Sequence, residues 1–400
     1  MTHELWRLSA VELAEAIRRK DVSCRDAIAS VLARIDETNP RVNALPEVLA
    51  DEAVAAADAA DRALARGEQI GPLHGVPVTT KVNVDQAGRA TTNGVVALRD
   101  LVAASDSPPV ANLTRAGAVV IGRSNTPAFS LRWFTDNDLH GRTLNPWNPG
   151  VTPGGSSGGA AAAVALGMGP IAHGNDYGGS IRYPAWACGV VGLRPTVGRV
   201  PAYNETANEE RGISSQLMSV QGPLTRTVAD ARLALAVMAE GDPRDPLWVP
   251  APSNDPDDGR PLKVALFRRH AAYDAHPSVI AALDQAASWL AAAGCRVDEF
   301  EPPHFEEAAQ LWRQLVYDDL RRSAWPAIEG MGDAAVRANF RLTIEGWREW
   351  DRDAYLDGLA RRLAIGRAWS LSSASTRFCC CRTPGSGNAR SMTTHARSSA

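Results

Sequence analysis

The sequence predicts an α/β fold in which helices cover a largely buried sheet. Helical stretches alternate with short β-branched runs over most of the chain, and segments rich in Gly, Pro and Asn separate them. The 400 residues, 45% hydrophobic and 22% charged, are enough to bury a substantial core. The formal net charge of -3 includes no basic stripe, which disfavours a nucleic-acid-binding protein.

The N-terminal region is predicted to form three helices. Ser9 begins the first through a capping box, and Ser23 caps a second helix that Pro40 is expected to end. Residues 49–66 predict a third, Ala-rich amphipathic helix that stops at Gly67.

The next segments predict strands and a glycine-rich loop. Residues 75–84 alternate in a way that places Lys81 on a polar face of a strand, and residues 116–125 are typical of a buried strand. The Gly, Pro and Asn of residues 145–159 predict a loop. Residues 158–167 predict a helix whose N-terminus points back at that loop.

The second half continues the alternation. Residues 221–240 predict a turn followed by a capped helix, and residues 262–267 predict a strand. A helix is expected over residues 278–294, ending at Gly294, and another strand over residues 295–300.

The C-terminal end departs from this pattern. Residues 370–400 contain no Asp, Glu, Val or Ile and only one Leu, so they offer little to bury. We expect a catalytic domain over residues 1–369 and an anomalous tail over residues 370–400 that is disordered or frame-shifted. A shift of one nucleotide would turn consecutive CTG leucine codons into TGC, which accounts for the run Cys379–Cys381.

Targeting and metal-binding signals are weak. The N-terminus has no apolar run between basic residues and a cleavage site, and no apolar run is long enough to span a bilayer, so a cytoplasmic location is expected. The six cysteines include no CxxC pair, so neither a metal site nor a disulfide framework is predicted.

Lysine is rare in this chain. Of 42 basic residues, only Lys20, Lys81 and Lys263 are lysines. The base composition of the gene can cause such an excess of arginine. Yet a side chain that must lose its proton to act as a base has to be lysine, so each one is a candidate functional residue.

The stretch GGSSGG over residues 154–159 allows three functional readings. Residues around it match no phosphate-binding motif, which disfavours a phosphate loop. Gly154, Ser156 and Gly158 satisfy GxSxG, but the preceding NPWNPGVTP cannot form the strand that a nucleophile elbow needs. The third reading adds residues 175–185, NDYGGSIRYPA, whose glycines leave main-chain amides uncovered beside a serine hydroxyl, as acyl transfer requires.

These motifs resemble the amidase signature family. GGSSGG is followed by a small-residue helix and by the pattern D-x-GGSIR-x-P-A, and a lysine ends a strand upstream. The resemblance covers about residues 5–370. It implies a single large amidase-signature-type domain with a central mixed sheet covered by helices on both faces. Family members usually continue with another strand and helices, so the C-terminal part is expected to be incomplete.

The resemblance also implies the roles of individual residues. Ser180 is the nucleophile, Ser156 the bridging serine in a cis peptide, and Lys81 the base of a Ser/cis-Ser/Lys triad. The expected oxyanion hole consists of the main-chain amides of Tyr177, Gly178, Gly179 and Ser180. The expected supporting residues are Ser157, Asp176 and Arg182, although Ser157 could be only a helix cap and the other two only a structural ion pair.

The predicted activity is hydrolysis of the carboxamide C–N bond of a small molecule through an acyl-enzyme, without cofactor or metal. No nucleic-acid or membrane partner is expected, and a homodimer is kept as an option. Two alternatives stay open: a glutamine-dependent amidotransferase A-type subunit, and a truncated inactive amidase homologue.

Some residues near the motif receive no assignment. Asn175 stands where a threonine or serine is common in the family, and Val82 stands where many relatives have Asp. His173 is placed in a Gly-rich loop and given no role. Trp133, Trp147 and Trp186 could line a pocket or fill a core.

Overall fold

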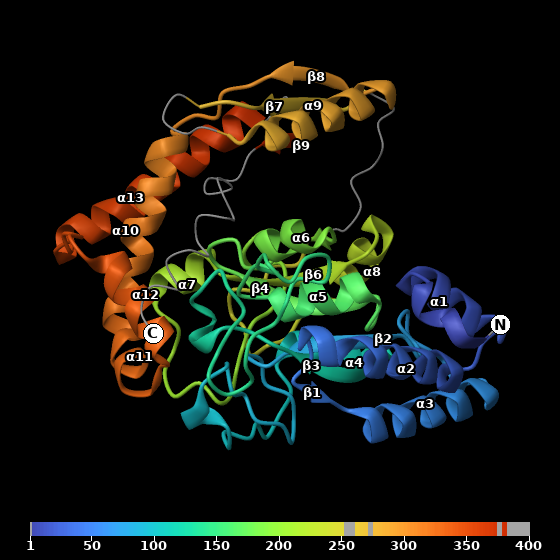
Figure 1. The fold of residues 1–400 in the computed structure, drawn as a ribbon. Coiled ribbons are helices and arrows are strands. Elements are labelled where there is room, and N and C mark those ends of the chain that lie inside the picture. Colours follow the sequence, from blue (N-terminus) through green and yellow to red (C-terminus); the bar gives the residue numbers. More distant parts are fainter. Residues whose placement is uncertain (1, 252–260, 271–274, 374–377, 382–400) are drawn as a thin grey trace. The chain divides into compact units, whose positions relative to one another are not determined.

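Two compact units make up the chain: residues 1–253 with 323–345, and residues 254–322 with 346–400. The structure is a computed structural model that describes residues 2–251, 261–270, 275–373 and 378–381 (Figure 1). Among these residues, no helix has both the length and the apolar composition needed to cross a bilayer.

A six-stranded mixed sheet forms the centre of the first unit, in the order β1-β3-β2-β4-β6-β5. Strand β2 pairs in parallel with both β3 and β4, and the other pairs are antiparallel. The strands are β1 (Glu47–Val48), β2 (Pro77–Lys81), β3 (Val119–Ser124), β4 (Ile171–Asp176), β5 (Val191–Gly192) and β6 (Val220–Thr225). The predicted central mixed sheet is confirmed.

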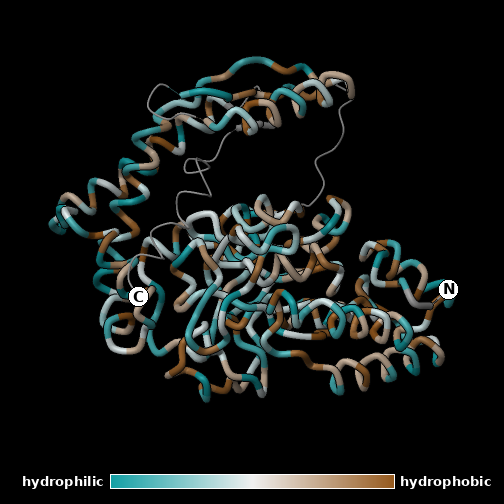
Figure 2. The backbone as a smooth tube through the Cα atoms, in the orientation of Figure 1, coloured by the Kyte–Doolittle hydropathy of each residue, from teal (hydrophilic) through white to brown (hydrophobic). Residues whose placement is uncertain are grey.

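Helices lie on both faces of this sheet. Neighbouring residues of β4 show it, since Ile171 packs with one buried apolar cluster and Ala172 with another. The first unit contains η1 (Thr2–Arg7), α1 (Ala10–Arg18), α2 (Cys24–Val42), α3 (Ala50–Ala65), η2 (Val96–Leu98), α4 (Pro108–Arg115), η3 (Ala128–Ser130), α5 (Gly158–Leu166), α6 (Arg182–Cys188), α7 (Ile213–Met218), α8 (Val228–Met238), α11 (Trp325–Met331) and α12 (Ala334–Ile344). Figure 2 shows hydrophilic and hydrophobic residues alternating around α2 and α3, as expected for helices with one buried face.

The predicted helix starts are confirmed and one predicted end is wrong. Ser9 forms the capping box with Glu12, and the Ser23 side chain accepts from the Asp26 amide. Helix α2 continues through Pro40, because a proline in the last turn removes only one helical hydrogen bond. The helix ends at Asn43, which adopts the left-handed conformation (φ 50°).

Three strand predictions need correction. Strand β2 ends at Lys81, and residues 82–84 turn away instead of extending the strand. His173, placed in a Gly-rich loop, lies instead on β4. Residues 220–225, read partly as a turn because of Gly222 and Pro223, form β6 between β4 and β5. Pairing with distant strands outweighs the local turn signals there.

The second unit holds a parallel three-stranded sheet in the order β8-β7-β9. Its elements are β7 (Lys263–Phe267), α9 (Pro277–Ala292), β8 (Arg296–Glu299), most of α10 (Phe305–Ser323), α13 (Arg352–Ser373) and β9 (Phe378–Cys381). The strands and helix predicted over residues 262–300 are thus observed. Of the predicted tail, residues 370–373 end α13 and residues 378–381 form β9, while residues 374–377 and 382–400 lie outside the described residues. The division at residue 369 stays a prediction.

Candidate active site

The side chain of Lys81 lies at the centre of a buried polar cluster. Its Nζ lies 2.7 Å from Ser156 Oγ, 3.2 Å from Ser157 Oγ and 2.8 Å from Asn175 Oδ1. Lys81 is 0% exposed. The last residue of β2 therefore meets the loop before α5 and the end of β4, as two adjacent parallel strands with a common edge allow.

The glycines of the GGSSGG stretch let main chain come close to main chain. A Cβ on Gly155 would lie 2.6 Å from Arg132 O, and a Cβ on Gly154 would lie 2.7 Å from the Pro184 Cα. Gly154 also has a φ of +83°, which disfavours any side chain. The peptide between Gly155 and Ser156 is cis, as the resemblance implied.

Ser180 lies in the turn between β4 and α6. The residue is 9% exposed, and its carbonyl accepts the Ser157 amide at 3.2 Å. This bond ties the turn to the loop that carries Ser156. The three serines predicted to act together thus come from two segments that the fold places in direct contact.

Asp176 organises the turn. Its carboxylate accepts the Gly179 amide at 2.9 Å and the Ile181 amide at 3.1 Å, and it pairs with both Arg182 Nε at 3.0 Å and Arg182 Nη2 at 2.8 Å. Arg194 Nε lies 3.6 Å from the same carboxylate. Asp176 and Arg182, two of the three predicted supporting residues, therefore form an ion pair that holds the loop around Ser180.

The predicted oxyanion amides are not equivalent. The Gly179 N–H already donates to Asp176, so this amide is committed to the turn. Tyr177 and Gly178 are partly exposed, whereas Gly179 and Ser180 are buried. The Tyr177 hydroxyl is hydrogen-bonded to Ser214, which holds its ring toward α7.

The buried setting controls the protonation of the basic groups. Burial holds the pKa of Lys81 well below 10.5, although the charge of Asp176 acts in the opposite direction. Burial alone would raise the pKa of Asp176, but hydrogen bonds and charge from Arg182 lower it overall. Burial likewise lowers the pKa of His173 to about 4, despite its hydrogen bond to Gln221.

Sequence reasoning did not assign a role to Asn175, which contacts Lys81 directly. Its departure from the usual threonine or serine was the only available signal. His173 is also fully buried near this cluster, and the Lys81 charge adds to the effect of burial in lowering its pKa. Among the described residues, no group of three or more His, Cys, Asp or Glu is arranged to hold a metal ion.

Comparison with known proteins identifies the family. The Amidase family profile matches residues 26–369. An indoleacetamide hydrolase of Bradyrhizobium diazoefficiens is 52% identical over 378 residues, which cover 92% of this chain and 70% of that protein. A second, from Bradyrhizobium japonicum, is 56% identical over 293 residues, 71% of this chain, and the match spans 61% of its length.

Other relatives and solved structures are more distant. The A-type subunit of the glutamyl-tRNA(Gln) amidotransferase of Moorella thermoacetica is 39% identical over 92% of this chain and 75% of its own length. The solved structure of fatty acid amide hydrolase superposes with a TM-score of 0.84 at 27% identity, covering 93% of this chain and 67% of that one. A bacterial aryl acylamidase of the amidase signature family superposes with a TM-score of 0.80 at 26% identity, covering 95% and 82%. The chain belongs to the amidase signature family of amide hydrolases, as its glycine and serine motifs predicted.

Proposed function

We propose that Lys81, Ser156 and Ser180 form the catalytic triad and that the substrate is a small arylacetamide. One observation carries the triad: an amine that is fully buried, whose pKa burial lowers, lies 2.7 Å from the hydroxyl of the serine that follows a cis peptide. An amine in that setting can be neutral at ordinary pH and can accept a proton.

In the proposed first half-reaction, Lys81 Nζ takes a proton from Ser156 Oγ, which takes one from Ser180 Oγ. The Ser180 oxygen attacks the amide carbonyl carbon, and the negative charge on the carbonyl oxygen is stabilised by main-chain amides of the turn. The proposed donors are the amides of Tyr177, Gly178, Gly179 and Ser180, of which the Gly179 amide also donates to Asp176. The proton returns through the same relay to the leaving nitrogen as the C–N bond breaks.

In the second half-reaction, water attacks the acyl-Ser180 ester. Lys81 and Ser156 again accept a proton, now from water, and return it to Ser180 as the C–O bond breaks. The products are a carboxylic acid and an amine or ammonia. Asp176, Arg182 and Ser157 hold the turn and the lysine in position and take no part in bond making.

Aromatic side chains beside the turn support an arylacetamide substrate. The Tyr183 ring is edge-on to Trp133 at 6.2 Å and stacked with Trp186 at 5.9 Å between centroids. Trp133 and Trp186 are 41% and 56% exposed, and Tyr183 lies three residues after Ser180. An exposed aromatic group offers a surface for an aryl ring. The two indoleacetamide hydrolases, at 52% and 56% identity, point to the same chemistry.

The test compares ammonia release from indole-3-acetamide, acetamide and glutamine. We expect hydrolysis of indole-3-acetamide with the highest kcat/KM, and loss of both turnover and fluorophosphonate labelling in Ser180→Ala. Truncating Trp186 to alanine should raise KM for indole-3-acetamide about tenfold and leave acetamide hydrolysis unchanged. Preference for glutamine together with a co-purifying second chain would favour an amidotransferase component, and a folded but inert protein would favour an inactive homologue.

We also propose that the enzyme acts in the cytoplasm. A homodimer is kept as a prediction for the assembly. Light scattering on the purified chain measures its mass and decides between monomer and dimer.

A further inference from the structure

The protonation state of Lys81 decides how many of its three hydrogen bonds the amine can donate. An ammonium group has three N–H donors, whereas a neutral amine has two donors and one free electron pair. Lys81 Nζ has three oxygen neighbours, from Ser156, Ser157 and Asn175. When the amine is neutral, only two of these oxygens can accept from it, and the third group must face the electron pair.

Asn175 must be one of the two acceptors. Its Oδ1 has no hydrogen to give, and this oxygen faces Lys81 because the other end of the amide is occupied. Asn175 Nδ2 donates to Asn83 Oδ1 at 3.1 Å, and Asn83 Nδ2 donates to Ser130 Oγ at 2.9 Å. The Ser130 hydroxyl in turn donates to Asn93 Oδ1 at 2.8 Å. In this series each amide nitrogen donates to the next oxygen, which leaves Asn175 Oδ1 as the end of the amide that faces Lys81.

Ser157 is the second acceptor. Its hydroxyl hydrogen points to the main-chain oxygen of Asn175 at 3.4 Å, which leaves the Ser157 oxygen to accept from Lys81. The remaining neighbour is Ser156, at the shortest of the three distances, 2.7 Å. The electron pair of the neutral amine therefore faces the Ser156 hydroxyl, which is the group that has to give up its proton.

We propose that Asn175, held by Asn83, is a positioning residue that aims the free electron pair of Lys81 at Ser156. This inference rests on the proposed function of Lys81 as base. It assigns a task to a residue that does not touch the substrate and that takes the place of a hydroxyl residue common in the family.

The Asn175 side chain carries no charge, and this also affects the protonation of Lys81. The charged and titratable groups around Lys81 are Asp176 and His173 on β4, with Arg182 and Arg194 directed at the Asp176 carboxylate. The arginines bond to the one carboxylate whose charge acts on the lysine. A second carboxylate at position 175 would face the amine directly and would favour its protonated, unreactive form.

The first experiment substitutes Asn175→Asp, which keeps the size of the side chain and adds a negative charge. Because the chain has three lysines, ¹³C-labelled lysine gives three side-chain NMR signals, and that of Lys81 is assigned by its loss in Lys81→Met. We expect Asn175→Asp to raise the pKa of Lys81 by about one pH unit or more. The acid limb of kcat against pH should move upward by the same amount. An unchanged Lys81 titration would overturn the proposal.

The second experiment uses two variants. Asn175→Leu removes the oxygen that accepts from Lys81, and Asn83→Leu removes the oxygen that accepts from Asn175. We expect kcat for indole-3-acetamide and the rate of Ser180 labelling by a fluorophosphonate to fall about 100-fold in Asn175→Leu, with KM within threefold. Asn83→Leu should lower both rates less. Asn175→Thr, which restores an oxygen acceptor, should recover at least a tenth of the wild-type rate. Rates within threefold of wild type in Asn175→Leu would count against the proposal.

A matched control separates positioning from folding. Asn112→Leu removes a buried amide on α4 that donates to Met238 O and Glu240 O, and we expect it to lower stability without lowering kcat.

Different results would refute the proposed substrate class and the proposed positioning role of Asn175. If wild type does not hydrolyse amides but Asn175→Asp still raises the Lys81 pKa, the substrate class is wrong and the contact stands. If wild type is active and the Asn175 variants match it, only the positioning role is lost.

Discussion

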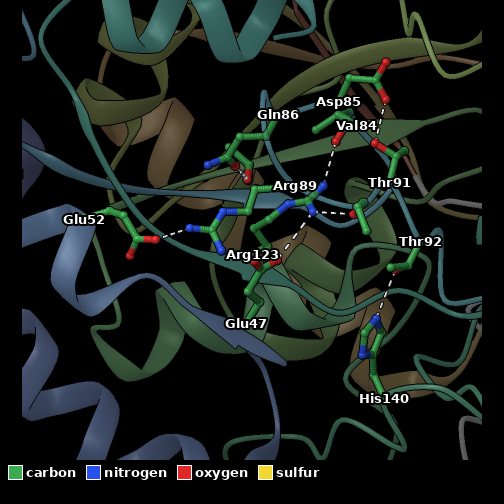
Figure 3. Close-up of polar contacts among 12 residues, drawn as sticks. Glu47, Glu52, Val84, Asp85, Gln86, Arg89, Thr91, Thr92, Arg123 and His140 are labelled. Carbon is green, nitrogen blue, oxygen red and sulfur yellow. Dashed lines mark hydrogen bonds and ion pairs between the residues drawn. The ribbon is translucent and has the colours of Figure 1, made fainter. Parts of the chain in front are cut away.

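Two basic side chains on neighbouring strands are both buried, yet their surroundings differ in kind. Lys81 ends β2 and Arg123 lies on β3, where Thr80 and Lys81 pair with Arg123 and Ser124. Both are 0% exposed. Lys81 contacts two hydroxyls and one amide oxygen, all neutral. Arg123 donates to Ala90 O at 2.5 Å and Val84 O at 2.8 Å, and it lies 3.4 Å from the carboxylate of Glu47 (Figure 3).

The difference shows how neighbouring strands of one sheet can surround one buried basic side chain with charge-compensating groups and another with neutral ones. A guanidinium stays protonated in a protein, so a buried arginine needs a carboxylate and carbonyl oxygens around it. Burial lowers the pKa of Arg123, and Glu47 opposes this effect. The carboxylate whose charge acts on Lys81, that of Asp176, is bonded to Arg182, and burial holds the pKa of Lys81 well below its ordinary value.

Arg123 and Lys81 therefore have different roles. Arg123 binds two carbonyls of the segment that follows Lys81, and Glu47 also pairs with Arg89, which in turn pairs with Glu52 (Figure 3). Arg123 holds the main chain that follows the lysine, and Lys81 is the residue for which we propose the role of base.

The largest effect is expected from replacing the base by a cation that cannot lose its proton. Lys81→Arg should lower kcat/KM for indole-3-acetamide about 10⁴-fold or more, because a guanidinium cannot accept the Ser156 proton. Steady-state ammonia release measures it. Activity above about one percent of wild type in a folded sample would show that Lys81 is not the base.

A smaller effect, on stability instead of rate, is expected at Arg123. Arg123→Met should lower the free energy of unfolding by about 3 kcal/mol, because it leaves buried carbonyls without donors and Glu47 with one cation fewer. Urea denaturation measures it, and the folded fraction should keep a kcat close to wild type. Arg89→Met is the control: its guanidinium is partly exposed, so the loss should stay below about 1 kcal/mol. Equal losses in the two variants would contradict the distinction drawn between buried and exposed cations.

His173 is, beside Lys81, a second buried base whose pKa is lowered by burial, and this gives a pH-dependent prediction. Its pKa is about 4 in the folded chain and 6.5 when unperturbed, so between these values only the unfolded state binds the proton. Stability should therefore fall as pH drops from 6.5 towards 4, by up to about 3 kcal/mol from this group. Denaturation midpoints measured across that range in wild type and His173→Gln test it. The variant should show a shallower decline, and parallel curves would rule out His173 as the cause.

Local signals predicted much of the framework. The helix starts at Ser9 and Ser23 depend on side chains that cap amides within three residues, so the sequence contains all the partners. Strands β4 and β6 were missed because Gly174, Gly222 and Pro223 carry local turn signals, whereas their pairing joins segments about fifty residues apart. The end of α2 was misplaced because the cap at Asn43, rather than Pro40, terminates it.

The candidate site, like the fold, was predicted from the sequence only in part. The sequence by itself determined which residue types could carry the chemistry, because a glycine and serine motif of this length and a lysine in an arginine-rich chain are properties of the sequence alone. Only the tertiary structure decided that Asn175 faces Lys81, that the Gly179 amide donates to Asp176, and that Arg123 lies within ion-pair distance of Glu47. Hydrogen-bond direction and burial depend on groups far apart in the chain, and those groups acquire fixed distances only when the strands pair.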